Sequence, residues 1–160
     1  MVCLDEMGPE SAKQEVDYGR RGKGTIFGAF QPATGDAFTR PCFSRRTANG
    51  VAFLEEVERW LPSEVERVDA IVDNLATHRA TDVLLFLLAH PRWEFVFQPK
   101  YAAAYLNLIE PWWKVLRSLA LKGRRFKAWT AIEEAVERAT AYGNDHRQPP
   151  SQGCSVLRLG

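Results

Sequence analysis

The stretch V-D-A-I-V-D-N-L-A-T-H, residues 68–78, decides the fold that we predict for this chain. Its first five residues, Val68–Val72, are almost all apolar, which is typical of a parallel strand covered on both faces. Asp73 follows where the apolar run stops. Ligands of open α/β sheets bind beyond the carboxyl ends of the strands, so this acid is a candidate site residue. Asp and Asn also favour turns and helix caps, so an equally good interpretation is that Asp73 and Asn74 only form the turn.

Length and composition indicate one globular domain. A chain of 160 residues is long enough to bury a core. No apolar run approaches the roughly 20 residues that span a bilayer, and no secretory signal is visible, so we expect a cytoplasmic protein without a membrane partner. The three cysteines are odd in number and far apart. They fit buried thiols in a reducing compartment better than disulfides or a zinc site.

Hydrophobic periodicity predicts the remaining elements. We expect strands over residues 2–4, 25–30, 37–43 and 93–98, and helices over residues 47–61, 79–89, 107–121 and 130–142. Thr130 and Glu133 form a capping-box pattern for the last helix. The first strand is expected to end at Asp5, before a break at Gly8-Pro9. This order predicts an α/β domain over residues 1–142, with a mixed five-stranded sheet and helices on its faces, followed by an irregular tail over residues 143–160.

Three acids occupy equivalent places in this scheme. Asp5 ends the first strand, Asp73 ends the fourth, and Glu110 lies in the first turn of the helix after the fifth. If the first and fourth strands are adjacent and parallel, all three carboxylates meet at one edge. Clustered carboxylates suit Mg²⁺ or Mn²⁺, and two such ions about 4 Å apart stabilise both oxygens of an in-line phosphodiester displacement.

Each acid also has a simpler interpretation. Asp5 can merely end a strand, and Glu6 competes with it for the same role, although Asp5 directly follows the apolar run. Asn107 and Glu110 have the spacing of a helix-capping pair, which is a strong alternative for Glu110.

A basic window follows the third acid. No acidic residue lies between Pro111 and Ile132. A local basic patch is a footprint for nucleic acid, whereas the more common interpretation is a solvated helix face. Trp112 and Trp113 share the apolar stripe of their helix and are expected in the core. The cations of the window are Lys114, Arg117, Lys122, Arg124, Arg125 and Lys127.

Three blocks, V-C-L-D-E-M-G-P, I-V-D-N-L-A-T-H and Y-L-N-L-I-E-P-W-W-K, resemble the catalytic blocks of DDE transposases. The sequence is most similar to the bacterial insertion-sequence transposases related to the mariner superfamily. This resemblance implies a ribonuclease H-like fold, with DNA cleavage and strand transfer at transposon ends by two Mg²⁺ (or Mn²⁺) ions. Matched by position, the catalytic and metal-binding acids are Asp5, Asp73 and Glu110. The basic cluster then becomes a candidate for holding DNA phosphates.

The resemblance also assigns supporting residues. Asn74 and His78 are expected near the metal edge, with His78 at the surface or a helix start rather than as a ligand, because carboxylates suffice for Mg²⁺. Asn107 is expected to cap the helix that presents Glu110.

Full-length relatives carry a helix-turn-helix module before the first catalytic strand, whereas Asp5 stands almost at the start here. We therefore expect a chain without its own DNA-binding module. Its expected partners are DNA, a separate helix-turn-helix polypeptide and a second copy of itself. Two alternatives stay open. One is an inactive remnant that acts as an interaction partner, and the other is a ribonuclease H-like nuclease on another nucleic-acid substrate.

Overall fold

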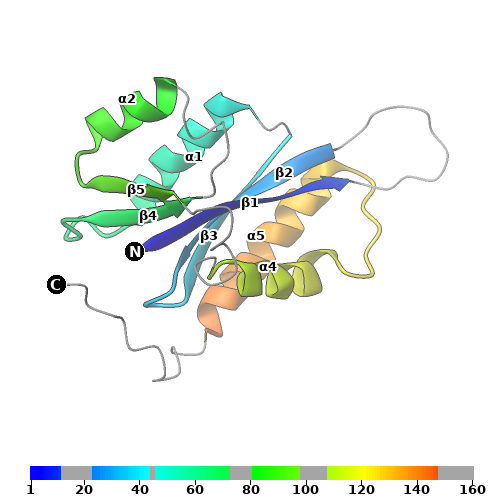
Figure 1. Cartoon of the computed structure of the whole chain (residues 1–160). Helices are drawn as coiled ribbons and strands as arrows, with labels where there is room; N and C mark the ends of the chain where they lie inside the picture. The colour runs from blue at the N-terminus through cyan, green and yellow to red at the C-terminus, as the bar shows by residue number, and fades with distance from the viewer. Residues whose placement is uncertain (12–22, 44–45, 73–80, 98–107, 148–160) are drawn as a thin grey trace.

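The computed structural model describes residues 1–11, 23–43, 46–72, 81–97 and 108–147. They form one sheet with helices packed against it (Figure 1). The strands are β1 (Val2–Ser11), β2 (Lys23–Gln31), β3 (Asp36–Cys42), β4 (Val68–Val72) and β5 (Trp93–Phe97). The helices are α1 (Thr47–Trp60), α2 (Thr81–Ala89), α4 (Glu110–Leu116), the π-helical segment η2 (Arg117–Leu121) and α5 (Trp129–Asp145).

The sheet has five strands in the order β3-β2-β1-β4-β5. β2 and β3 form the predicted antiparallel hairpin, and β2 is also antiparallel to β1. β4 pairs with β1 and with β5 in parallel. The predicted mixed five-stranded α/β architecture is therefore confirmed, and β1 lies at its centre between β2 and β4.

Helices cover both faces of the sheet, and the sheet therefore separates two hydrophobic cores. α1 and α2 lie on one face, while α4 and α5 lie on the other (Figure 1). Strand alternation assigns the side chains of β1 to the two cores, because successive residues point to opposite faces. Leu4 packs with the α1–α2 side, whereas Cys3 and Met7 pack with the α4–α5 side.

β1 is longer than the sequence predicts, so the predicted strand end at Asp5 is wrong. The parallel pairing with β4 stops at Leu4, but antiparallel pairing with β2 carries the strand on to Ser11. Gly8 does not break the strand. It adopts a φ of 144°, at a register shift that bends β1 without ending it.

The helix predicted over residues 107–121 changes its winding in the middle. The amide of Lys122 donates to the carbonyl of Arg117 at 2.7 Å, an i to i+5 bond that closes a π turn. The wider turn keeps Leu116 and Ala120 in the core. Helical spacing also predicts Leu119 on this apolar stripe, but Leu119 is exposed, so that prediction is wrong.

The last helix also differs from its prediction. α5 begins at Trp129, and Ala128 at its N-cap makes no side-chain cap hydrogen bond, so the predicted capping box of Thr130 and Glu133 is wrong. The helix continues to Asp145, beyond the predicted end at residue 142. The rest of the predicted tail, residues 148–160, lies outside the described residues.

The burial of cysteine thiols is a prediction from the sequence that the structure tests. Cys3 and Cys42 are buried, as predicted, and burial raises the pKa of both thiols. Cys154 lies outside the described residues. Within the described part of the chain, no helix is long and apolar enough to cross a bilayer.

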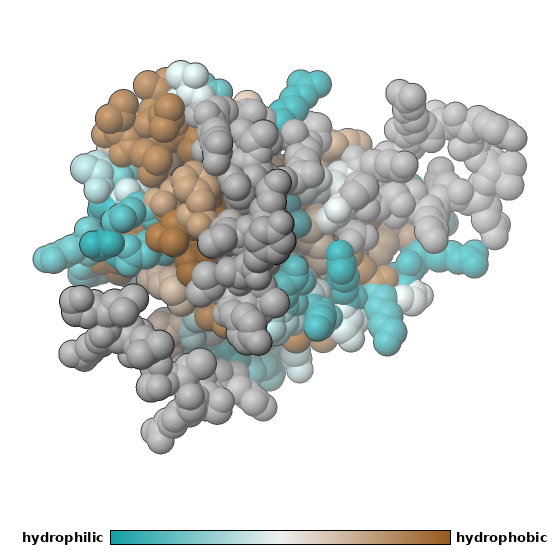
Figure 2. All heavy atoms as spheres, in the orientation of Figure 1, coloured by the Kyte–Doolittle hydropathy of each residue, from teal (hydrophilic) through white to brown (hydrophobic). Residues whose placement is uncertain are grey.

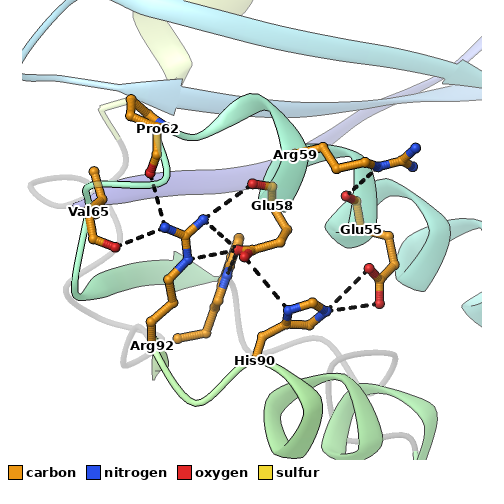
Figure 3. A network of polar contacts seen from close by, with 8 residues as sticks. Glu55, Glu58, Arg59, Pro62, Val65, His90 and Arg92 are labelled. Carbon is orange, nitrogen blue, oxygen red and sulfur yellow. Dashed lines mark hydrogen bonds and ion pairs between the residues drawn. The ribbon is translucent and has the colours of Figure 1, made fainter.

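A polar network joins the end of α1 to the start of β5 (Figure 3). The carboxylate of Glu58 accepts hydrogen bonds from Trp93 Nε1 at 2.6 Å and from Arg92 Nε at 3.0 Å. Nη1 of Arg92 also donates to the carbonyl oxygens of Pro62 and Val65. Burial alone would raise the pKa of Glu58, but these donors and the charge of Arg92 outweigh it, so the pKa is lowered.

We predict that Glu58→Gln lowers the free energy of unfolding by about 1–3 kcal/mol at neutral pH, because it removes charge-assisted hydrogen bonds. The folded-state pKa of Glu58 lies below its ordinary value of 4.5, so its contribution is complete above pH 4.5 and is lost as pH falls through the folded-state pKa. Urea unfolding at several pH values should show the difference from wild type shrinking in acid. The exposed Glu64→Gln serves as control, and an equal effect of both changes would contradict the prediction.

Candidate active site

Asp5 lies in the middle strand of the sheet, on the side of α4 and α5. It shares this side with Cys3 and Met7, because side chains alternate along β1. Its backbone partner in β2 is Gly28. The carboxyl group is half-buried. Asp5 is therefore held in a rigid element while part of its side chain remains accessible.

Trp113 of α4 donates a hydrogen bond from its indole Nε1 to Oδ2 of Asp5, at 3.0 Å. This is a contact between residues far apart in the chain. Trp112 and Trp129 are buried in the same core, yet the indole nitrogens of both lack a hydrogen-bond partner among the described residues. The hydrogen bond to Asp5 therefore fixes the orientation of one particular tryptophan and ties the start of α4 to β1.

Gly28 makes room for this tryptophan. A Cβ atom at Gly28 would lie 2.2 Å from the ring of Trp113, far inside van der Waals contact. Glycine within a strand often marks the close approach of another group, and that signal is visible in the sequence. Gly28 is not among the site residues predicted from the sequence. Gly28 is a positioning residue of the site, because it lets Trp113 reach the carboxylate on the neighbouring strand.

Glu110 is the first residue of α4 and is exposed. It precedes Trp113 by three residues, and this spacing places both on the same side of a helix. The helix begins at Glu110 with Ile109 as its N-cap, so Glu110 does not stand at the third helical position that the capping-pair alternative requires. Its proposed capping partner, Asn107, lies outside the described residues.

The described part of the site is incomplete on the side of β4. The parallel register pairs Leu4 with Val72, the residues directly before Asp5 and Asp73 in the sequence. Asp73 itself lies outside the described residues, as do Asn74 and His78. Within the described ranges, no group of three His, Cys, Asp or Glu side chains is placed to hold a metal ion.

Glu6, the competitor of Asp5, is the next residue along β1. Successive strand residues point to opposite faces, so Glu6 belongs to the side of α1 and α2. Trp113 donates its indole hydrogen bond to Asp5 and not to Glu6. The described geometry therefore favours Asp5 over Glu6 as the acid on the α4 side.

The predicted basic residues lie on the surface beyond α4. A hollow of about 450 Å³ lies along α4 and η2. Its lining residues are Lys114, Arg117, Ser118, Leu121 and Lys122. The other predicted cations, Arg124, Arg125 and Lys127, are exposed in the segment between η2 and α5. The π turn forms part of the wall of this hollow, since it includes Arg117 and ends just before Lys122.

Comparison with known families shows the family of this chain. Residues 7–133 match the family described as DDE superfamily endonuclease, and the chain belongs to this family. The comparison with curated proteins finds no match. The sheet order and the helices on both faces are those of a ribonuclease H-like domain, as predicted. The family implies a nuclease that acts on DNA, and its members generally use divalent metal ions.

We predict that Gly28→Ala lowers the free energy of unfolding by about 1–3 kcal/mol, because the new methyl group displaces the Trp113 ring. The matched control is Gly50→Ala in α1, where a Cβ atom meets nothing within 4 Å. There the same change should be neutral or stabilise by up to about 1 kcal/mol, since it reduces the freedom of the unfolded chain. Urea unfolding followed by tryptophan fluorescence measures both, and equal stabilities of the two variants would refute the close approach.

Proposed function

We propose that this chain is the catalytic domain of a transposase, which cleaves DNA at transposon ends and transfers the cut strand in a metal-dependent reaction. The observation that carries the proposal is the hydrogen bond from Trp113 to Asp5. It attaches the first turn of α4, which begins at Glu110, to the strand that runs beside β4. Two of the three candidate acids thus come from elements in direct contact.

We propose Asp5, Asp73 and Glu110 as the catalytic and metal-binding acids. Asp73 directly follows the last residue of β4 in the sequence, and Val72 pairs with Leu4. If the same register continued for one more residue, it would bring Asp73 opposite Asp5. This placement agrees with the rule that ligands bind beyond the carboxyl ends of parallel strands.

The carboxylate oxygens of Asp5 and Glu110 are suitable ligands for a hard divalent cation. Asp5 accepts its hydrogen bond from a neutral indole, and neither Asp5 nor Glu110 forms an ion pair with another described residue. Within the described residues, no side-chain cation therefore competes for these two carboxylates with Mg²⁺ or Mn²⁺, which prefer oxygen ligands. Two bound ions would supply electrostatic stabilisation of the attacking and leaving oxygens at phosphorus. Trp113 contributes by holding Asp5 in one orientation, which lowers the cost of ordering the carboxylate.

We propose that DNA phosphates lie along the hollow beside η2. Lys114 of α4, Arg117 of η2 and Lys122 directly after η2 line it, on the helical stretch that continues from Glu110. Cations on this surface would attract the phosphate backbone without reading its sequence. Arg124, Arg125 and Lys127 would extend the same contact. Recognition of particular end sequences by a separate helix-turn-helix polypeptide, and membership of the mariner-related group, stay predictions from the sequence.

We predict that wild-type protein with Mn²⁺ nicks duplex DNA, and that Asp5→Asn or Glu110→Gln lowers the nicking rate by about 100-fold or more, because each removes a charge from the ion site. Glu134→Gln on the exposed side of α5 makes the same chemical change away from the site and should leave the rate unchanged. The measurement is the initial rate of nicking of supercoiled plasmid, with circular dichroism to verify folding.

Two outcomes of this assay would contradict the proposal. Faster cleavage of a matched RNA–DNA hybrid than of duplex DNA would favour a ribonuclease H-like nuclease of different substrate. No nicking of any DNA by wild-type protein, even with a separate DNA-binding polypeptide supplied, would favour an inactive remnant.

A further inference from the structure

The outer side of α2 is strongly apolar. Leu84, Leu85 and Leu88 expose 55%, 57% and 79% of their surfaces, while Val83 and Phe86 point into the core. The spacing of the three exposed leucines places them on one side of the helix. Figure 2 shows the resulting brown area at the upper left, where Figure 1 places α2. Contiguous exposed apolar patches of this kind mark interaction surfaces.

The apolar surface continues onto the edge strand β5. Trp93, Phe95 and Phe97 alternate on the α2 side of this strand, with successive ring centroids 6.3 Å apart. Trp93 also contacts Phe86 of α2, at 5.2 Å between ring centroids. Phe97, at the end of the row, is 42% exposed. We call the outer leucines of α2 together with β5 the α2–β5 face.

The two edge strands, β3 and β5, differ in whether side chains bind their outer backbone groups. At the β3 edge, the side-chain amide of Asn144 both accepts from the amide of Ala37 and donates to its carbonyl oxygen, each at 2.8 Å. These bonds occupy backbone groups that an incoming strand would need. No described side chain caps the backbone of β5 in this way, and β4 is its single neighbour in the sheet. Among the described residues, the outer edge of β5 is therefore open to strand pairing.

We propose that the α2–β5 face binds a second copy of this chain. Antiparallel pairing of β5 with its counterpart would continue the sheet across a two-fold axis, which makes the same patch serve on both copies. The same axis places the two α2 helices on one side of the joined sheet, so that their leucines cover each other. One occupant thus accounts for both the open strand edge and the exposed leucines.

The charges of this face also favour a second copy. Glu94 is the one charged residue of β5, and Nη2 of Arg67 neutralises it at 2.7 Å. Asp82 is the one charged residue of α2, in its first turn. Self-pairing therefore meets little like-charge repulsion. Both elements lack cations that would attract phosphates, so nucleic acid is a poor occupant, and the basic hollow belongs to α4 and η2 on the opposite side of the sheet.

The size of the face sets the expected affinity. A nine-residue helix is about 13 Å long, and a five-residue strand is about 17 Å long. A contact limited to these two elements is at the small end of specific interfaces. We expect a dimer with a dissociation constant in the micromolar range.

The test is sedimentation equilibrium of the full chain over about 1–200 µM, a range that brackets micromolar dissociation. The wild type should shift from 18.1 kDa to twice that mass with rising concentration. Leu88→Glu should weaken self-association at least tenfold, since it places two like charges in a desolvated contact. Leu88 is the most exposed of the three leucines, so folding should survive the change, and circular dichroism verifies this. Val115→Glu on α4 is the matched control and should dimerise like the wild type.

Three results would overturn the proposal. They are a wild type that stays at 18.1 kDa throughout, a Leu88→Glu variant that associates as tightly as wild type, and a Val115→Glu variant that is the weaker of the two. The measurement needs neither DNA nor metal, so its outcome is separate from that of the nicking assay.

Discussion

The hydrogen bond between Trp113 and Asp5 is the contact on which the arrangement of the site depends. Asp5 is fixed by the sheet, because it pairs with Gly28 of β2 and directly follows the residues of β1 that also pair with β4. α4 carries Glu110 at its start, and packing against the sheet together with this bond holds it in place. The bond is possible because Gly28 leaves space beside Asp5 for the indole ring. A glycine, a tryptophan and an acid from three elements together place the helix that presents the second acid.

The two faces of the sheet differ in the side chains that they present and in the functions that we propose for them. On one face α4, η2 and α5 cover β1, and the polar and basic groups proposed for catalysis and DNA contact belong to this side. On the other face α1 and α2 are tied to β5 by the network around Glu58 and Arg92 (Figure 3). That network gives the edge strand a fixed position although it has a single neighbour. A rigid edge beside exposed leucines is a surface on which a second copy can pair without first ordering it, which lowers the entropic cost of association.

Local patterns in the sequence predict most of the elements, because periodicity and turn residues act over short distances. The hairpin of β2 and β3, the helix α1 and the buried strand β4 all follow from such patterns. The extension of β1 could not be predicted in this way, since its polar residues are held by pairing with β2. The start of α5 was missed for a similar reason. Trp129 packs over Gly24, where a Cβ atom would lie 2.3 Å from the ring, and this tertiary contact outweighs the capping preference of Thr130.

In the candidate site too, local sequence patterns predict some features, whereas tertiary contacts determine others. Asp5 and Glu110 can be selected from the sequence because acids that follow apolar strands or open helices are noticeable by type and position. The contact between Asp5 and Trp113 joins residues far apart in the chain, and nothing local distinguishes Trp113 from Trp112 as its donor. The π turn at η2 is equally hidden, because its residues would suit an ordinary α-helix. Asp73 remains a prediction, supported by the register of β1 with β4.

The proposed divalent-ion site includes Asp5 and lies beside the start of α4. Its presence can be measured by the effect of added Mn²⁺ on the indole N–H resonances of the tryptophans, because a paramagnetic ion broadens nearby protons. We expect the Trp113 signal to disappear first, since its N–H donates to Asp5. The Trp93 signal should persist, because its N–H donates to Glu58 on the opposite face. The Asp5→Asn variant should lose the selectivity. Equal broadening of both signals, or selective broadening that survives Asp5→Asn, would show that Asp5 does not bind the ion.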